Sequence, residues 1–306
     1  MKARRPNFFI VGAPKCGTTA MDFYLAQHPD IFMARKECHH FATDFMPEDD
    51  PDTQRERYLA LFAEASSETM LGESSVFYLY SKAAARNIYD FNPDAKIIVQ
   101  LRNPVDVLIS HHSQVIFNGE EDLTDLREAM AAEKDRREGR RIPCKMQFLD
   151  RLYYSELFNF PEQLDRYFSV FGRDQVHVVI FEDFKSDTTG EYHRTLEFLG
   201  VDTDVTVDFK VVNANKTIRS PLLRSLLREP PAPISTAFRL FFPLNTREAI
   251  KQFLKKANTR YEPRKPIDIE FRNLLTRKYA NDVERLSVLL DRDLTSWNDI
   301  GAVEIE

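Results

Sequence analysis

Residues 7–19 read NFFIVGAPKCGTT, and this stretch decides the fold. Its first part, Asn7–Val11, is a short apolar run that ends at Gly12, which predicts a buried strand. A loop follows, and the amphipathic residues after Gly17 predict a helix. A strand, a glycine-containing loop and a helix together form a geometry that binds phosphate. The N–H groups of the loop and first turn converge on one point, at the positive end of the helix dipole.

The side chains of this loop also favour an anion. Lys15 supplies a positive charge, and Thr18 and Thr19 supply hydroxyl donors. The nucleoside triphosphate pattern GxxxxGK[ST] requires a lysine directly after its second glycine, but Thr18 occupies that position here. We therefore expect a different anionic ligand. The alternative is an ordinary strand–turn–helix with a surface lysine.

The sequence GAPKCGTT resembles the 5′-phosphosulfate-binding loop of sulfotransferases that use 3′-phosphoadenosine 5′-phosphosulfate (PAPS), which commonly reads G-x-x-K-x-G-T-T/S. The resemblance implies cofactor contacts from the lysine of the loop and from the four residues that follow it: Lys15, Cys16, Gly17, Thr18 and Thr19. It implies a catalytic role for Lys15 as well. Cys16 is either a small filler of the loop, the favoured interpretation, or a thiol whose pKa is lowered there.

A dense titratable cluster follows in the segment KECHHF, residues 36–41. One interpretation is a solvated loop whose Glu37, His39 and His40 face water. The segment also resembles K-E-x-H-F-F of carbohydrate-type sulfotransferases, in which the glutamate is the general base. The resemblance implies that Glu37 is the base. It departs from the family at His40, where an aromatic residue is usual, so His39 and His40 are rival bases.

A third segment, MLGESSVFYLYS at residues 70–81, resembles the family's G-E-x-S/T-P-x-Y. Glu73, Ser75 and Tyr78 match it, while Val76 replaces the usual proline. Ser74 stands where relatives acting on heparan sulfate have a lysine. Any catalytic help from that lysine is therefore absent or supplied elsewhere.

A second buried strand is predicted by the apolar, β-branched run Lys96–Leu101. Pro104 then opens a helix. Arg102 follows the strand directly, and Ser110 lies about two helical turns beyond it. Ligands of open α/β sheets bind outside the carboxyl ends of strands, so we expect Arg102 on the same rim as the loop at residues 12–19.

This segment resembles the family's 3′-phosphate motif L-R-[ND]-P-x-[DE]-x-x-x-S, which implies that Arg102 and Ser110 hold the 3′-phosphate. A structural salt bridge is the alternative for Arg102. Two motifs in the family's order, roughly 90 residues apart, are far more specific than either alone. Weaker nucleotide-binding candidates lie further along the chain: Tyr153, Lys216, Arg219, Arg264 and Lys265.

The remaining pattern alternates helices and strands. Helices are predicted over residues 52–65, 150–172 and after residue 268, with a strand near 176–184. The family resemblance further implies a helix over residues 191–201 and a core anchor at Trp297. The Pro-rich apolar segment 229–245 either covers an acceptor site, touches lipid or packs as a plain loop.

Composition excludes several classes. The 306 residues are 43% hydrophobic and 29% charged, as in a soluble globular protein, and the net charge of −6 argues against a nucleic-acid binder. No apolar run approaches a membrane span, although peripheral contact stays open. Cys16, Cys38 and Cys144 form no metal spacing or disulfide framework, which favours a reducing cytoplasm. No metal ligand pattern stands out.

We therefore expect one α/β domain over residues 1–306. Its core, residues 7–200, would be a parallel sheet with helices on both faces and a P-loop-like phosphosulfate-binding loop. Residues 213–306 would form a helical C-terminal portion. The resemblance implies transfer of a sulfuryl group from PAPS, without metal, to a hydroxyl or amine of a small-molecule, carbohydrate or lipid acceptor by in-line displacement. The alternatives are a P-loop kinase or nucleotidase and a non-catalytic nucleotide-binding module.

Overall fold

The computed structural model describes residues 4–44, 51–144, 146, 148–210, 216–220, 223–224, 226, 244–261 and 267–300. The chain forms two compact units. The first contains residues 1–111, 153–212 and 268–306, and the second contains residues 112–152 and 213–267. The expectation of a single domain stays a prediction.

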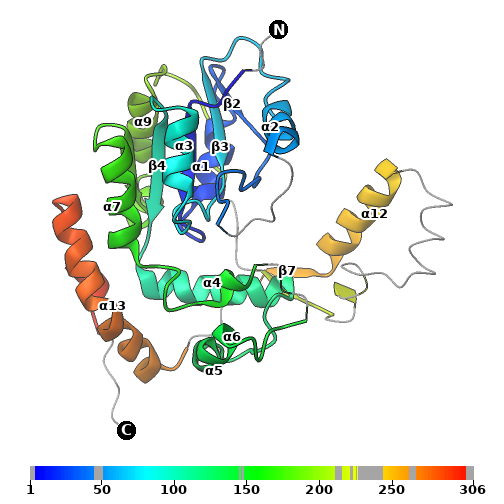
Figure 1. The fold of residues 1–306 in the computed structure, drawn as a ribbon, viewed down its shortest axis with the longest axis vertical. Helices are drawn as coiled ribbons and strands as arrows, with labels where there is room; N and C mark the ends of the chain where they lie inside the picture. Colours follow the sequence, from blue (N-terminus) through cyan, green and yellow to red (C-terminus); the bar gives the residue numbers. More distant parts are fainter. Residues whose placement is uncertain are drawn as a thin grey trace. The chain divides into compact units, whose positions relative to one another are not determined.

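The first unit is built on one parallel sheet (Figure 1). Its strands are β1 (Phe8–Gly12), β2 (Ile31–Met33), β3 (Met70–Ser74), β4 (Lys96–Leu101) and β5 (Val176–Ile180). They pair in the order β2-β3-β1-β4-β5, and all four pairings are parallel. The chain leaves β1 toward β3 and β2 but leaves β4 toward β5. The ends of β1 and β4 therefore form a switch point, where open α/β sheets bind ligands.

Helices flank the sheet, as expected (Figure 1). The helices of the first unit are α1 (Thr18–Leu25), α2 (Pro51–Ala60), α3 (Ala84–Phe91), α7 (Phe160–Phe171), α8 (Phe181–Ser186), α9 (Thr188–Leu199) and α13 (Ile269–Leu290). Met21 of α1 and Leu196 of α9 share a buried cluster with Ile10 and Ile98, so both helices cover one face of the sheet. Helices α3 and α7 pack together through Tyr89 and Phe171.

Helix α4 (Pro104–Asn118) begins in the first unit and ends in the second. The second unit contains α5 (Leu126–Ala131), α6 (Glu133–Arg137), the 3₁₀ helix η1 (Leu149–Leu152) and α12 (Leu244–Ala257). Its strands β6 (Lys216–Ile218) and β7 (Thr259–Tyr261) pair antiparallel. The apolar segment 229–245 lies outside the described residues up to residue 243.

One predicted helix is wrong in its first half. The pattern over residues 150–172 predicted a continuous helix, but only η1 and α7 are helical within it, and α7 begins at Phe160. Pro161 is the physical reason, because proline lacks the N–H of a helix interior and fits only the first turn. The strand near 176–184 likewise ends at Ile180, where α8 takes over.

Two further expectations can be compared with the fold. Trp297, in the 3₁₀ helix η2 (Thr295–Asn298), is buried, which confirms it as a core anchor. In the described ranges no helix combines the length and the apolar character that crossing a membrane requires.

Candidate active site

The loop after β1 contains two glycines that leave little or no room for a side chain. A Cβ on Gly12 would lie 2.7 Å from Leu79 Cβ and 2.8 Å from the carbonyl oxygen of Val76. Gly17 has φ 93°, in the left-handed region, and its Cβ would meet the Phe181 ring at 3.1 Å. The spacing of the glycines in the motif therefore has a steric cause.

The loop opens onto the first turn of α1, which begins at Thr18. The first N–H groups of a helix have no acceptor within it, and the dipole adds partial positive charge there. No acidic residue in the first turn of α1 offsets that charge. Lys15 is half-buried in the loop itself. This end of β1 therefore suits an anion.

A second lysine reaches the same place. Lys36 Nζ lies 3.4 Å from both Thr18 Oγ1 and Thr19 Oγ1. Burial lowers the pKa of Lys36, while the charges of Asp22 and Glu37 oppose that shift. Burial also raises the pKa of Asp22 to about 6. The sequence analysis identified Lys36 only as the first residue of the segment KECHHF. Its contact with the loop could be found only from the folded structure.

Cys16 is a buried side chain of the loop. Its side chain is fully buried beneath the loop, and its Sγ lies 3.6 Å from the carbonyl oxygen of Pro14. Burial raises the pKa of the thiol, so the alternative of a lowered pKa is wrong. Cys16 fills the loop.

Glu37 and His39 form a pair directly beyond Lys36. Glu37 Oε2 lies 3.1 Å from His39 Nε2. The exposed fraction is 30% for the Glu37 side chain and 7% for that of His39. Within the pair, Glu37 is the group that another molecule can reach.

His40 points to a different environment. Its ring stacks on Tyr58 with centroids 4.2 Å apart and planes inclined by 7°. Burial, together with the charge of Arg55, lowers the pKa of His40. The imidazole therefore packs as the aromatic ring that relatives usually have at this position.

Arg102 stands at the end of β4, beside the loop. Its guanidinium carbon lies 4.6 Å from the centroid of the Phe181 ring, which also limits the space at Gly17. Its Nη2 lies 3.4 Å from Asp106 Oδ2. The expectation that Arg102 shares a rim with the loop is confirmed by the pairing of β1 with β4 and by these contacts. Its contact with phosphate stays a prediction.

The surroundings of Arg102 include a residue that sequence reasoning missed. Asp106 Oδ1 lies 2.7 Å from Arg272 Nη2, so two guanidinium groups share one carboxylate. Arg272 belongs to α13, and no local pattern links it with α4. Ser110 is buried on α4.

The other predicted residues are placed less completely. Tyr153 is half-buried in the first unit, directly after η1. Lys216 and Arg219 belong to the second unit and stay predictions. Arg264 and Lys265 lie outside the described residues. Where the chain is described, no three His, Cys, Asp or Glu side chains gather as a metal site requires.

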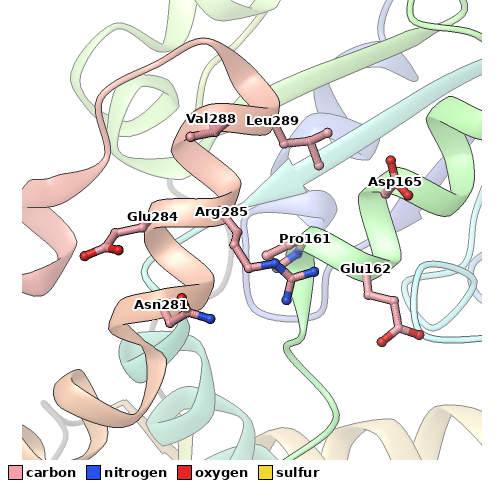
Figure 2. A pocket seen from close by; sticks show the side chains of 8 residues that line it. All are labelled: Pro161, Glu162, Asp165, Asn281, Glu284, Arg285, Val288 and Leu289. Atoms are coloured by element: carbon pink, nitrogen blue, oxygen red, sulfur yellow. The ribbon is translucent and has the colours of Figure 1, made fainter.

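A groove between α7 and α13, with a volume of about 540 Å³, is a separate feature (Figure 2). Its lining residues include none of the predicted site residues: Pro161, Glu162, Asp165, Asn281, Glu284, Arg285, Val288 and Leu289. The lining contains three carboxylates and a single guanidinium, so the groove disfavours an anionic cofactor.

Comparison with known proteins identifies the class. The model of the sulfotransferase domain family matches residues 5–218, and the chain belongs to this family. A crystal structure of a sulfotransferase from Alicyclobacillus acidocaldarius is similar over 97% of this chain and 100% of its own, with a TM-score of 0.70 and 32% identity.

Curated relatives extend the comparison. Human heparan sulfate glucosamine 3-O-sulfotransferase 6 is 30% identical over 220 residues, which cover 70% of this chain and 58% of the relative. A membrane-associated sulfotransferase of Dictyostelium discoideum is 30% identical over 108 residues, covering 35% of this chain and 22% of the relative. The chain thus spans little more than half the length of the human relative.

Proposed function

We propose that this protein transfers a sulfuryl group from PAPS to a hydroxyl or amine of an acceptor by in-line displacement. One observation carries the proposal. Lys36 contacts Thr18 and Thr19 of the loop, while the next residue, Glu37, presents a carboxylate. An anion site and a candidate base are therefore adjacent, as group transfer requires.

The loop residues fit the anionic end of PAPS, which supplies the activated sulfuryl group when bound. Lys15 and Lys36 neutralise charge on the 5′-phosphate as the bond to sulfur breaks. Thr18, Thr19 and the first N–H groups of α1 orient it. Groups preorganised where charge develops contribute more to rate than groups that must move.

Glu37 takes the proton of the acceptor's hydroxyl or amine group as the oxygen or nitrogen of that group bonds to sulfur. Two features support Glu37 over His39: its greater exposure, and its contact with an imidazole that can donate to the carboxylate. His40 is a weaker candidate, because it stacks on Tyr58.

The 3′-phosphate would bind at the end of β4. Arg102 offers a permanently charged fork for it. Arg272 adds a second guanidinium close to Arg102 through the shared Asp106. Ser110, eight residues beyond Arg102, would donate a hydroxyl.

The acceptor that we favour is a carbohydrate hydroxyl, because the human relative is a glucosamine sulfotransferase. Small-molecule and lipid acceptors are tested beside it. We also propose a reducing, cytoplasmic location, since Cys16, Cys38 and Cys144 are free thiols. Fractionation of the native host separates this location from the membrane association named for the Dictyostelium relative.

Calorimetric titration tests the cofactor. PAPS, its desulfated product and ATP are each titrated with and without magnesium. We expect PAPS and its desulfated product to bind without magnesium and ATP to bind poorly. Magnesium-dependent ATP binding without PAPS binding would instead indicate a kinase or nucleotidase. A screen of carbohydrate, lipid and small-molecule acceptors with labelled PAPS then tests transfer.

A further inference from the structure

Behind the segment 36–41 lies a buried carboxylate that takes no part in the proposed chemistry. Glu73, on β3, is 0% exposed. Three hydroxyl groups donate to it: Tyr78 at 3.0 Å, Tyr58 at 3.2 Å, and Ser75 at closer range. A buried carboxylate is costly unless it is hydrogen-bonded, and these three donors satisfy it.

The same three residues hold the segment that carries the candidate base. Ser75 Oγ accepts a hydrogen bond from the His39 N–H at 3.0 Å, and Tyr78 Oη accepts one from the Phe41 N–H at 3.3 Å. The ring of Tyr58 stacks on His40. Each of the residues 39–41 is therefore tied to a group that donates to Glu73.

The direction of these bonds depends on Glu73. A hydroxyl has one proton, and a carboxylate only accepts. Because the protons of Ser75 and Tyr78 point to Glu73, their lone pairs are left to accept from the backbone. If either hydroxyl turned its proton toward the segment, that proton would point at the N–H group of His39 or Phe41, and two donors would face each other.

The segment needs such support. His39 has φ 51°, in the left-handed region. A non-glycine residue in this region is strained and keeps its conformation only when its surroundings determine it. His39 is also the residue in contact with Glu37, so its backbone conformation sets where the pair points.

We propose that Glu73 is a positioning residue, which aligns the Glu37–His39 pair by polarising the hydroxyls of Ser75, Tyr78 and Tyr58 toward itself. The assignment of a catalytic effect rests on the proposed function. The effect on the backbone does not.

Glu73→Gln is the direct test. The amide keeps the size of the carboxylate but places an N–H₂ donor against hydroxyl protons. We expect kcat to fall by about 10²-fold, the scale of a misplacement near 1 Å, with PAPS affinity unchanged. Hydrogen exchange of the His39 and Phe41 amides should become faster, while that of α1 amides stays the same.

Single hydroxyl deletions keep the test decisive even where Glu73→Gln does not fold. Ser75→Ala should speed exchange mainly at the His39 amide, and Tyr78→Phe mainly at the Phe41 amide. Both should lower kcat without weakening PAPS.

Tyr167→Phe is the matched control. The Tyr167 hydroxyl is also buried and donates to the Tyr78 carbonyl oxygen at 2.9 Å, so its proton is directed to the backbone and not to the Glu73 carboxylate. Its loss should lower stability like Tyr78→Phe and leave kcat and both amides unchanged.

Two results would overturn the proposal. One is unchanged exchange at His39 and Phe41 in the Ser75 and Tyr78 variants. The other is an equal loss of kcat in Tyr167→Phe and Tyr78→Phe, which would indicate a purely structural role. If the wild-type protein transfers no sulfuryl group, the proposed function fails, and the exchange measurements still test the positioning of the backbone.

Discussion

The loop at residues 12–19 and the segment at residues 36–41 adjoin, yet they are held in different ways. The loop depends on its backbone conformation, with Gly12 where a Cβ would clash and Gly17 where φ is 93°. The segment is held from behind by hydroxyl groups that follow it in the chain by about 20 to 40 residues, all directed to Glu73.

The difference separates binding from chemistry. Backbone N–H groups and a helix dipole bind an anion whatever the side chains of the loop are. Placing a base requires a particular side chain in a particular orientation, which only packing can provide. We therefore expect changes in the segment to alter turnover and changes in the loop and on β4 to divide between turnover and binding.

The largest expected effect is that of Glu37→Gln. The amide preserves size but cannot take a proton, so kcat should fall by about 10²–10⁴-fold while PAPS affinity stays nearly unchanged. Steady-state kinetics and calorimetry measure the two quantities. Should this variant stay active while His39→Ala or His40→Ala is dead with PAPS still bound, a histidine is the base.

Lys15→Ala should come next, with kcat lower by about 10²–10³-fold, the scale of losing one preorganised donor. Its charge matters most as the 5′-phosphate departs, so saturation with PAPS should not restore the rate. A variant that binds PAPS poorly but keeps wild-type kcat at saturation would remove Lys15 from the transition state.

Arg102→Ala tests whether the residue that follows β4 binds the 3′-phosphate. Losing one charge-assisted contact costs about 1.5–3 kcal/mol, so PAPS affinity should fall by about 10–150-fold. Adenosine 5′-phosphosulfate, which lacks the 3′ group, should be almost unaffected. Equal weakening of both ligands in calorimetry would leave the pair with Asp106 as the role of Arg102.

Asp22→Asn tests a buried carboxyl group on α1, whose charge acts on Lys36. Burial raises the pKa of Asp22 to about 6, so the native state holds the proton more tightly than the unfolded chain. The stability contribution of Asp22 should therefore fall as pH rises from about 4 to about 6. The variant should match the wild type near pH 4 and be more stable above pH 6, by about 1–2 kcal/mol since partial exposure screens the charge. Denaturant unfolding at several pH values measures this, and a pH-independent difference would contradict it.

The smallest effect should be that of His40→Phe. The ring stacked on Tyr58 is retained, and an aromatic pair is worth only about 0.5–1.5 kcal/mol beyond its burial. We expect kcat within about threefold of wild type and an unchanged pH profile. A large loss of turnover in His40→Phe would show that the imidazole itself takes part.

Local patterns predicted much of this site. Strand Lys96–Leu101 has the predicted bounds, because buried parallel strands are continuous apolar runs. The loop after β1 was predicted from the glycine that ends the strand, and the position of Arg102 from the proline that begins the next helix. The helix predicted over residues 150–172 is wrong in its first half, because Pro161 fits only the first turn of a helix and α7 therefore begins at Phe160.

The sequence by itself therefore determined the local structures, and its motifs indicated the family. Only the tertiary structure decided which distant side chains meet: Lys36 with Thr18 and Thr19, Arg272 with Asp106, and three hydroxyls with Glu73. The physical reason is range. Strand periodicity and turn chemistry act over a few residues, whereas ion pairs and hydrogen bonds between elements depend on how the packed sheet brings those elements together.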